Sequence, residues 1–249
     1  MRVTDSIRYD LINRRLSSLQ SNYLEVANQA TTGQRVNNPS EDPAAAAEAS
    51  RIRSGLSKVE AQQSNLDMVQ GDVESAESTL SQVGEILQRI GELAMTGSND
   101  TYSADDRKAL SLEVSELTKQ VISLANTQGS RGYLFSGTLT DTATLDSSGQ
   151  FQANDAEQLL DLGVGEPVGV SVSGARAFTA VGGRDIVATL RTLASALEAN
   201  DSAGVRAMLG DVQESHDQVQ RERSRAGMLL NRLEMSSTVL EQTQLNLQK

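Results

Sequence analysis

Residues 66–94 read LDMVQGDVESAESTLSQVGEILQRIGELA, and this stretch decides the fold. Its apolar side chains recur at alternating intervals of three and four residues, which is the spacing of a coiled-coil seam. One seam position holds Leu66, Val73, Leu80, Leu87 and Ala94, and the other holds Val69, Ala76, Val83 and Ile90. Four uninterrupted heptads predict a long helix that packs lengthwise against other helices.

The start of this long helix is marked by a break in the sequence. Asn37 and Pro39 oppose helix continuation, whereas Asp42 suits an N-cap and Pro43 suits the first helical position. The next turn signal is Gly97-Ser98-Asn99-Asp100. A helix from Pro43 to Thr96 is therefore predicted, with a length of roughly 80 Å.

Two further helices have the same periodicity. One follows a cap at Ser103 or Asp105 and has the predicted seam Leu110, Val114, Leu117, Val121 and Leu124. The last begins after Asn200-Asp201, runs for about 45 residues, or ~65–70 Å, and includes Leu230 and Leu233 in its seam. The two long helices are natural antiparallel partners. We therefore expect a mainly α fold, an elongated antiparallel helical rod with a small β insert at its tip.

The insert is recognised by a change in composition. Between residues 130 and 183, Val and Thr alternate with Gly and Ser, as at Val168, Val170 and Val172, which predicts two or three short strands. We expect three regions on this basis: residues 1–41 as a terminal assembly segment, residues 42–130 and 184–249 as the rod, and residues 131–183 as the β-rich insert.

The N-terminal segment carries an apolar stripe of its own. A helix is predicted from about residue 4 to residue 31, and Gly33 is suited to end it. The stripe comprises Ile12, Leu16, Leu19, Tyr23 and Val26. Because it lies beyond the break at Pro39, outside the predicted rod, we interpret it as an interaction surface. Isolated helices are marginal in water, so we expect this segment to be disordered until another subunit covers it.

The composition argues against catalytic and metal sites, and against nucleic-acid and membrane partners. The chain has no Cys, no Trp, three Pro, one His and 3% aromatic residues, so neither a thiolate site nor a histidine cage can form. The formal net charge of −11 argues against nucleic-acid binding, and no apolar run has the length of a membrane span. His216 falls in the last seam and is predicted to be structural. We expect a protein that is not an enzyme, with no metal, no cofactor and no membrane or nucleic-acid partner.

Three stretches of the sequence carry motifs of one family. Residues 32–43, TGQRVNNPSEDP, resemble the junction between terminal helix and rod in the bacterial flagellins and their relatives. Tyr133, Leu134, Phe135 and Gly137 are similar to the motif that enters the β region of the family's hook–filament junction branch, as are the opening residues 1–4. Asn231 and Arg232 lie in a stretch similar to the C-terminal rod helix. The resemblance covers nearly the whole chain outside residues 139–183.

The resemblance implies a structural protein of the bacterial flagellum. Members of the family are exported through the flagellar type III apparatus, and residues 1–8 lack the apolar core of a cleavable secretion signal. The implied location is extracellular, in the flagellum. The implied partners are further copies of the chain, the other hook-associated junction protein, flagellin and an export chaperone. The family also implies a second terminal helix beyond Lys249, so residues 1–31 are expected to lack an intrachain partner.

Two other interpretations stay open at this point. A short filament flagellin has the same rod and the same terminal helix, and it differs in polymerising alone. A cytosolic coiled-coil adaptor would share the seams without any link to flagella.

Overall fold

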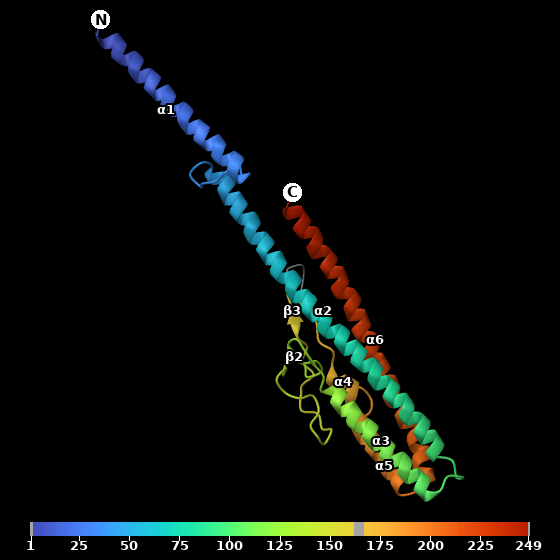
Figure 1. Cartoon of the computed structure of the whole chain (residues 1–249). Helices are drawn as coiled ribbons and strands as arrows, with labels where there is room; N and C mark the ends of the chain where they lie inside the picture. Colours follow the sequence, from blue (N-terminus) through green and yellow to red (C-terminus); the bar gives the residue numbers. More distant parts are fainter. Residues whose placement is uncertain (1, 162–166, 249) are drawn as a thin grey trace. The chain divides into compact units, whose positions relative to one another are not determined.

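The computed structural model describes residues 2–161 and 167–248, with side chains from residue 7 onward. Its helices are α1 (Arg2–Thr32), α2 (Pro43–Gly97), α3 (Ala104–Ala125), α4 (Gly174–Phe178), α5 (Ile186–Glu198) and α6 (Ser202–Leu247), and its strands are β1 (Gln128–Gly129), β2 (Gly132–Tyr133), β3 (Leu159–Leu160) and β4 (Val168–Gly169) (Figure 1). The expectation of a mainly α fold with a small β insert is confirmed.

The chain divides into two compact units. The first contains residues 1–59 and 247–249, and the second contains residues 60–246. The first unit therefore includes α1, the connector and the first turns of α2. Helix α2 begins at Pro43, and the backbone N–H of Ala45 donates to Oδ1 of Asp42 at 3.0 Å, which is the geometry of an N-cap.

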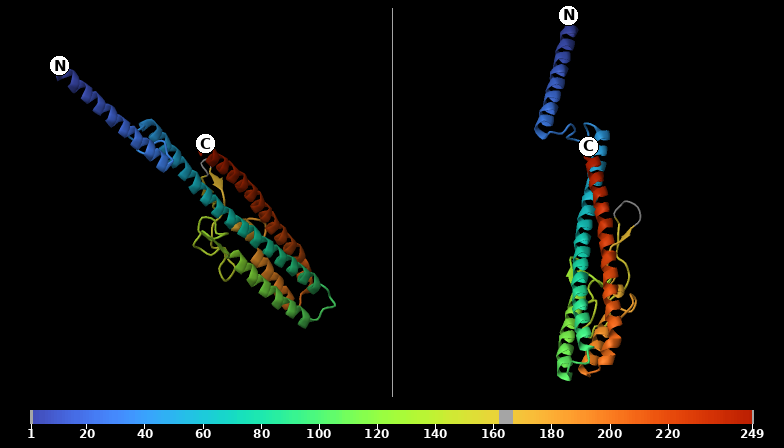
Figure 2. Two further views of the ribbon diagram at one scale, coloured as in Figure 1. Left: turned by 45° about the horizontal axis from the view of Figure 1, so that its top comes forward. Right: turned by 90° about the vertical axis from the view of Figure 1, so that its right-hand side faces the viewer.

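Within the second unit, α2 and α6 lie side by side and antiparallel (Figure 2). Gln63 Nε2 donates to Ser237 Oγ at 2.8 Å, and Arg223 Nε lies 2.6 Å from Glu77 Oε1. These contacts fix the register of the two helices. Between them the predicted seam is buried, with Leu66, Leu80, Val83 and Ile90 of α2 and Val219 and Leu233 of α6 fully enclosed. Burying a side chain of this size stabilises the fold by roughly 1.5–3 kcal/mol.

Helices α3 and α5 pack against each other and complete this unit. Ser103 caps α3 in a capping box with Asp106, and Asp185 caps α5 through the N–H of Ala188. Ser111 Oγ donates to the carbonyl oxygen of Ala194 at 2.8 Å, which joins the two helices through a polar contact.

The buried face of α3 differs from the predicted seam. Val114 and Val121 are buried as expected, but Leu117, like Leu110 and Leu124, is only half-buried. The other buried members of this face are Arg107, Ser111, Thr118 and Ala125. Thr118 satisfies its hydroxyl by donating to the carbonyl of Val114 at 2.7 Å. Because these polar groups find partners, the helix is rotated from the position that leucine spacing alone predicted.

The insert contains less strand than expected. Strands β1 and β2 pair antiparallel, and so do β3 and β4, each over two residues. The expected strand through Val172 ends at Gly169, and Ser173 instead caps the short helix α4. Phe135 and Phe178 meet edge to face with ring centroids 5.3 Å apart, and both are buried. One aromatic pair thus forms the centre of this small region.

Candidate assembly interface

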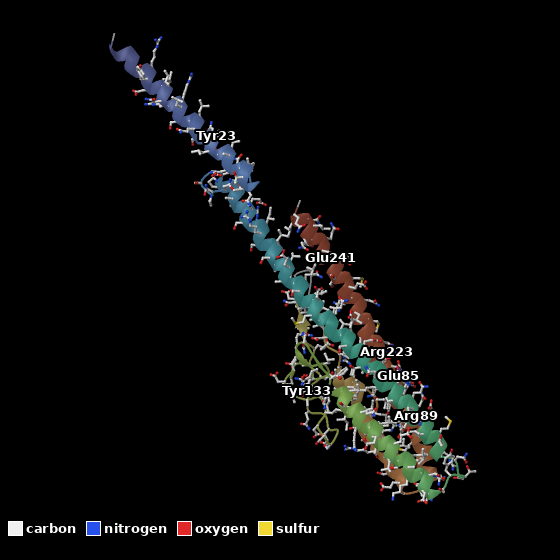
Figure 3. The ribbon with its side chains drawn as sticks, in the orientation of Figure 1. Tyr23, Glu85, Arg89, Tyr133, Arg223 and Glu241 are labelled. Atoms are coloured by element: carbon white, nitrogen blue, oxygen red, sulfur yellow. The ribbon has the colours of Figure 1, made fainter. Side chains whose placement is uncertain are left out.

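The apolar stripe of α1 is open to solvent. Ile12, Leu16, Leu19, Tyr23 and Val26 are between 53% and 73% exposed, and Tyr23 projects from α1 in Figure 3. Ile7, Leu11 and Leu24 are also more than half exposed. A helix of 31 residues that buries none of these side chains has little packing to stabilise it. The structure gives this predicted interaction surface a regular helical backbone.

The connector between α1 and α2 is hydrogen-bonded along its length. Gly33 has φ +68° after the last turn of α1, and its N–H donates to the carbonyl of Gln29 at 2.8 Å. The Glu41 carboxylate accepts from the N–H of Asn37 and from Asn38 Nδ2, both at 2.9 Å. Pro39, between them, is exposed. The predicted break between the two helices is therefore a folded turn in this structure.

Two carboxylates organise this connector electrostatically. The hydrogen bond from the Asn37 backbone, followed by that from the Asn38 side chain, lowers the pKa of Glu41. The pKa of Asp42 is lowered by the backbone hydrogen bond from Ala45 and then by Arg35, whose Nη2 lies 3.1 Å from Asp42 Oδ2. Both carboxylates are stabilised in their ionised forms.

The remaining seam residues of the prediction are covered by other parts of the chain, and Val73 lies beside the insert residues Arg131 and Tyr133. Val69, Val73 and Leu87 are at most 2% exposed, and Leu230 is half-buried on α6. These side chains are occupied within the chain, so they serve the fold.

The family-motif residues lie in two different parts of the structure, the insert and the surface of α6. Tyr133 and Leu134 are half-buried in the insert, where Tyr133 belongs to β2 (Figure 3), and Phe135 is fully enclosed. Gly137 has φ +64°, and a Cβ there would collide with Asn154 and the Ala156 carbonyl. Asn231 and Arg232 are exposed on α6.

Several buried polar residues were not predicted from the sequence. Asp72 on α2 accepts hydrogen bonds from Arg131 Nε at 2.9 Å and from the N–H of Ser130 at 2.7 Å. Burial raises the pKa of Asp72, but these hydrogen bonds outweigh it and hold the pKa below its ordinary value. Gln218 donates to the carbonyls of Ala177, Thr179 and Arg184. In the sequence, Asp72 and Gln218 stand out only as polar residues that directly precede a seam residue.

Arg107 is a further buried polar residue, and it lies where α2 ends in the second unit. The guanidinium of Arg107 donates to the carbonyls of Gly97 and Asn99, both at 2.8 Å, and contacts Asn200 Oδ1. It thereby satisfies carbonyls left open where α2 ends. His216 is half-buried beside Asp217 and Gln220. Among the described residues, no group of three His, Cys, Asp or Glu side chains could hold a metal ion, and no helix is long and apolar enough to cross a membrane.

Comparisons with known proteins identify relatives of this chain. Flagellar hook-associated protein 3 of Escherichia coli K12 is 33% identical over 148 residues, which cover 57% of this chain and 45% of that protein. The protein of the same name from Salmonella typhimurium is 29% identical over 187 residues, covering 73% and 58%. The chain spans about half the length of these curated relatives.

The fold has been seen before in a solved structure. A putative flagellar hook-associated protein from Vibrio parahaemolyticus superimposes with a TM-score of 0.77 at 22% identity, covering 85% of this chain and 97% of that one. This likeness confirms the fold class. The model of the bacterial flagellin N-terminal helical region matches residues 7–140, more than half of the chain. The chain therefore belongs to the bacterial flagellin family.

Proposed function

We propose that this chain is a structural subunit of the bacterial flagellum that joins the hook to the flagellin filament. Two relatives bear the name of a hook-associated protein, which supports this position in the flagellum rather than a position within the filament. The described residues contain no metal-binding cluster, and composition offers no thiolate or histidine pair for catalysis. Mechanical assembly is the role that fits these features.

The exposed stripe of α1 is the observation that carries the proposal. Its apolar residues are spaced to face one side of a helix, yet all of them are open to water. Burial between subunits stabilises such a helix, so its folding is coupled to polymerisation. We propose residues 1–41 as the assembly segment on this basis.

The partners and the location follow from this role. The subunit contacts further copies of itself, the other hook-associated junction protein on the hook side and flagellin on the filament side. It reaches the cell exterior unfolded, through the flagellar type III apparatus, with an export chaperone that covers its apolar stripes before assembly. A long helix without disulfides suits such passage, since the described fold has no covalent cross-link to undo.

A deletion strain tests this proposal. Cells that lack the gene are expected to build hooks, to lack filaments and to release unpolymerised flagellin into the medium. Complementation with the full gene is the matched control and is expected to restore filaments. Hooks that still carry filaments in the deletion strain would contradict the proposal, and long homopolymers from the purified protein alone would favour a filament flagellin instead.

A further inference from the structure

Helix α6 carries a face of arginine and methionine that stays exposed among the residues that the structure describes. Met228 and Met235 are each 64% exposed and Val239 is 46% exposed. Arg221, Arg225 and Arg232 are exposed, and together with Met228, Met235 and Val239 they share one face at intervals of three and four residues. We define the basic face as Arg221, Arg225, Met228, Arg232, Met235 and Val239. Arg225 contacts the buried Glu222, so part of its charge is balanced, while Arg221 donates to the carbonyl of Gly182.

Helix α2 presents a face of the opposite character. We define the acidic face as Glu60, Ser64, Asp67, Gly71, Glu74 and Ser78, all of them exposed. Carboxylates alternate with small residues, and a Cβ placed on Gly71 would meet no atom within 4 Å. Both faces span 18 residue steps, or ~27 Å of helix. Within one chain they do not meet, because α2 and α6 contact through their buried seams.

The two faces match in size and charge when they run antiparallel. This alignment pairs Arg225 with Glu74, Met228 with Gly71, Arg232 with Asp67 and Met235 with Ser64. Arg225 and Arg232 then each meet a carboxylate, and each long thioether meets a residue small enough to accept it. At the ends of the two faces, Arg221 lies opposite Ser78 and Glu60 lies opposite Val239. A parallel alignment would instead place Met228 against Asp67 and Arg232 against Gly71, so that only Arg221 and Glu60 would form a charge pair.

From this complementarity we propose that the basic face of α6 docks antiparallel on the acidic face of α2 in a second copy of the chain. The contact rests on the proposed function, because it supplies one lateral contact of the assembled structure. It joins two different surfaces and therefore propagates from copy to copy instead of closing at a dimer. Within one chain Gln63 lies opposite Ser237 and Glu77 opposite Arg223, so the paired residues lie at one level. Neighbouring copies thus stand side by side with little axial offset.

The area of this contact is small, so we expect the contact to form within an assembly and to be weak between two free copies. Two helix faces ~27 Å long and ~10 Å wide bury less than the ~1,200 Å² of a stable protein–protein interface. A pair of copies is therefore weak in dilute solution. In an assembly, many such contacts act together with those of α1 and become effective.

Cysteine pairing tests the contact directly, because the natural chain has no cysteine. Full-length Ser64→Cys and Met235→Cys proteins are mixed at high concentration under mild oxidation. A mixed disulfide is expected to form at least ~tenfold faster than between Ser64→Cys and Leu112→Cys, which places an equally exposed thiol on α3. The double variant Ser64→Cys/Met235→Cys is expected to give a ladder of multimers. Equal rates for both pairs, or self-linked dimers of Ser64→Cys alone at the same speed, would overturn the proposal.

Charge reversal tests the pairing chemistry. Arg232→Glu in the double-cysteine chain is expected to slow ladder formation by about tenfold, and adding Asp67→Arg is expected to restore it. Lys108→Glu changes the same charge on α3 and is expected to have no effect. Failure of Asp67→Arg to restore the ladder would contradict the assigned register. If Arg232→Glu leaves cross-linking unchanged while the deletion strain behaves as proposed, this contact is wrong and the junction role stands.

Discussion

The carboxylate of Asp72 and the guanidinium of Arg131 join α2 to the start of the insert, with Oδ2 and Nε 2.9 Å apart. Ser130 adds its N–H and its hydroxyl to the other carboxylate oxygen. Asp72 is buried and Arg131 is half-buried. Three donors thus converge on one carboxylate and hold the insert against the long helix.

Removing this carboxylate should loosen the insert. Asp72→Ala removes the acceptor of Arg131 Nε and of the Ser130 N–H and hydroxyl, while Arg131 Nη1 keeps its hydrogen bond to Gln158. We expect a loss of roughly 2–3 kcal/mol in the free energy of unfolding, typical of hydrogen bonds to charged groups. Urea unfolding followed by circular dichroism measures this loss. Asp67→Ala, on the exposed side of the same helix, is the matched control and should change stability little. Equal effects would contradict the role of Asp72.

The same pair predicts a pH dependence with a definite sign. The pKa of Asp72 is lower in the folded state than in the unfolded chain, so its contribution is complete above the unfolded value of about 3.9 and disappears as the pH falls through the folded value. The wild type should therefore lose stability faster than Asp72→Asn as the pH falls below about 4. Parallel unfolding curves for the two proteins across this range would contradict the lowered pKa.

A cavity in the buried seam of α2 is expected to lower the free energy of unfolding strongly. Leu80 is fully buried, and Leu80→Ala should cost about 2–5 kcal/mol of unfolding free energy. Leu112→Ala on α3 removes the same atoms from a side chain that is 64% exposed and should be nearly neutral. Chemical denaturation of both variants provides the comparison. A cost below about 1 kcal/mol for Leu80→Ala would show that the seam does not form as described.

The cap of α3 offers a local test. Ser103 accepts from the N–H of Asp106 and anchors the capping box, so Ser103→Ala should cost about 1 kcal/mol. For a chain of this size that corresponds to a fall of about 2–4 °C in melting temperature. Ser103→Thr keeps a cap hydroxyl and should retain most of the stability. An unchanged melting temperature for Ser103→Ala would contradict the cap.

The long helices could be predicted because their signal repeats. Leu66 to Ala94 carries four heptads, and α2 ends at Gly97, one residue beyond the prediction. Ser103 and Asp42 act as caps where their side chains suggested it. In each case the determining interaction is local or periodic, and the sequence alone contains it.

Other features depend on residues far apart in the chain. The buried face of α3 includes Arg107, whose partners are backbone carbonyls at Gly97 and Asn99 and the amide of Asn200. Because these partners lie outside the helix, the burial of Arg107 could not be predicted from the apolar periodicity. Helix α4 has five residues, too few for a periodic signal. The pairing of Asp72 with Arg131 spans 59 residues and arises only once the insert folds back. The acidic and basic faces could be identified only from the solvent exposure of each residue in the structure.

The central claim is that α1 supplies an apolar surface that other subunits cover. Its most direct test is incorporation of Leu16→Asp/Leu19→Asp into flagella sheared from cells, measured by immunoblot. Ser17→Asp/Ser21→Asp places the same charges on the opposite side of α1 and serves as the control. We expect the control to be incorporated and the Leu16→Asp/Leu19→Asp protein to be absent from flagella while it retains the helicity of residues 60–246. Normal incorporation of the leucine variant would contradict the account.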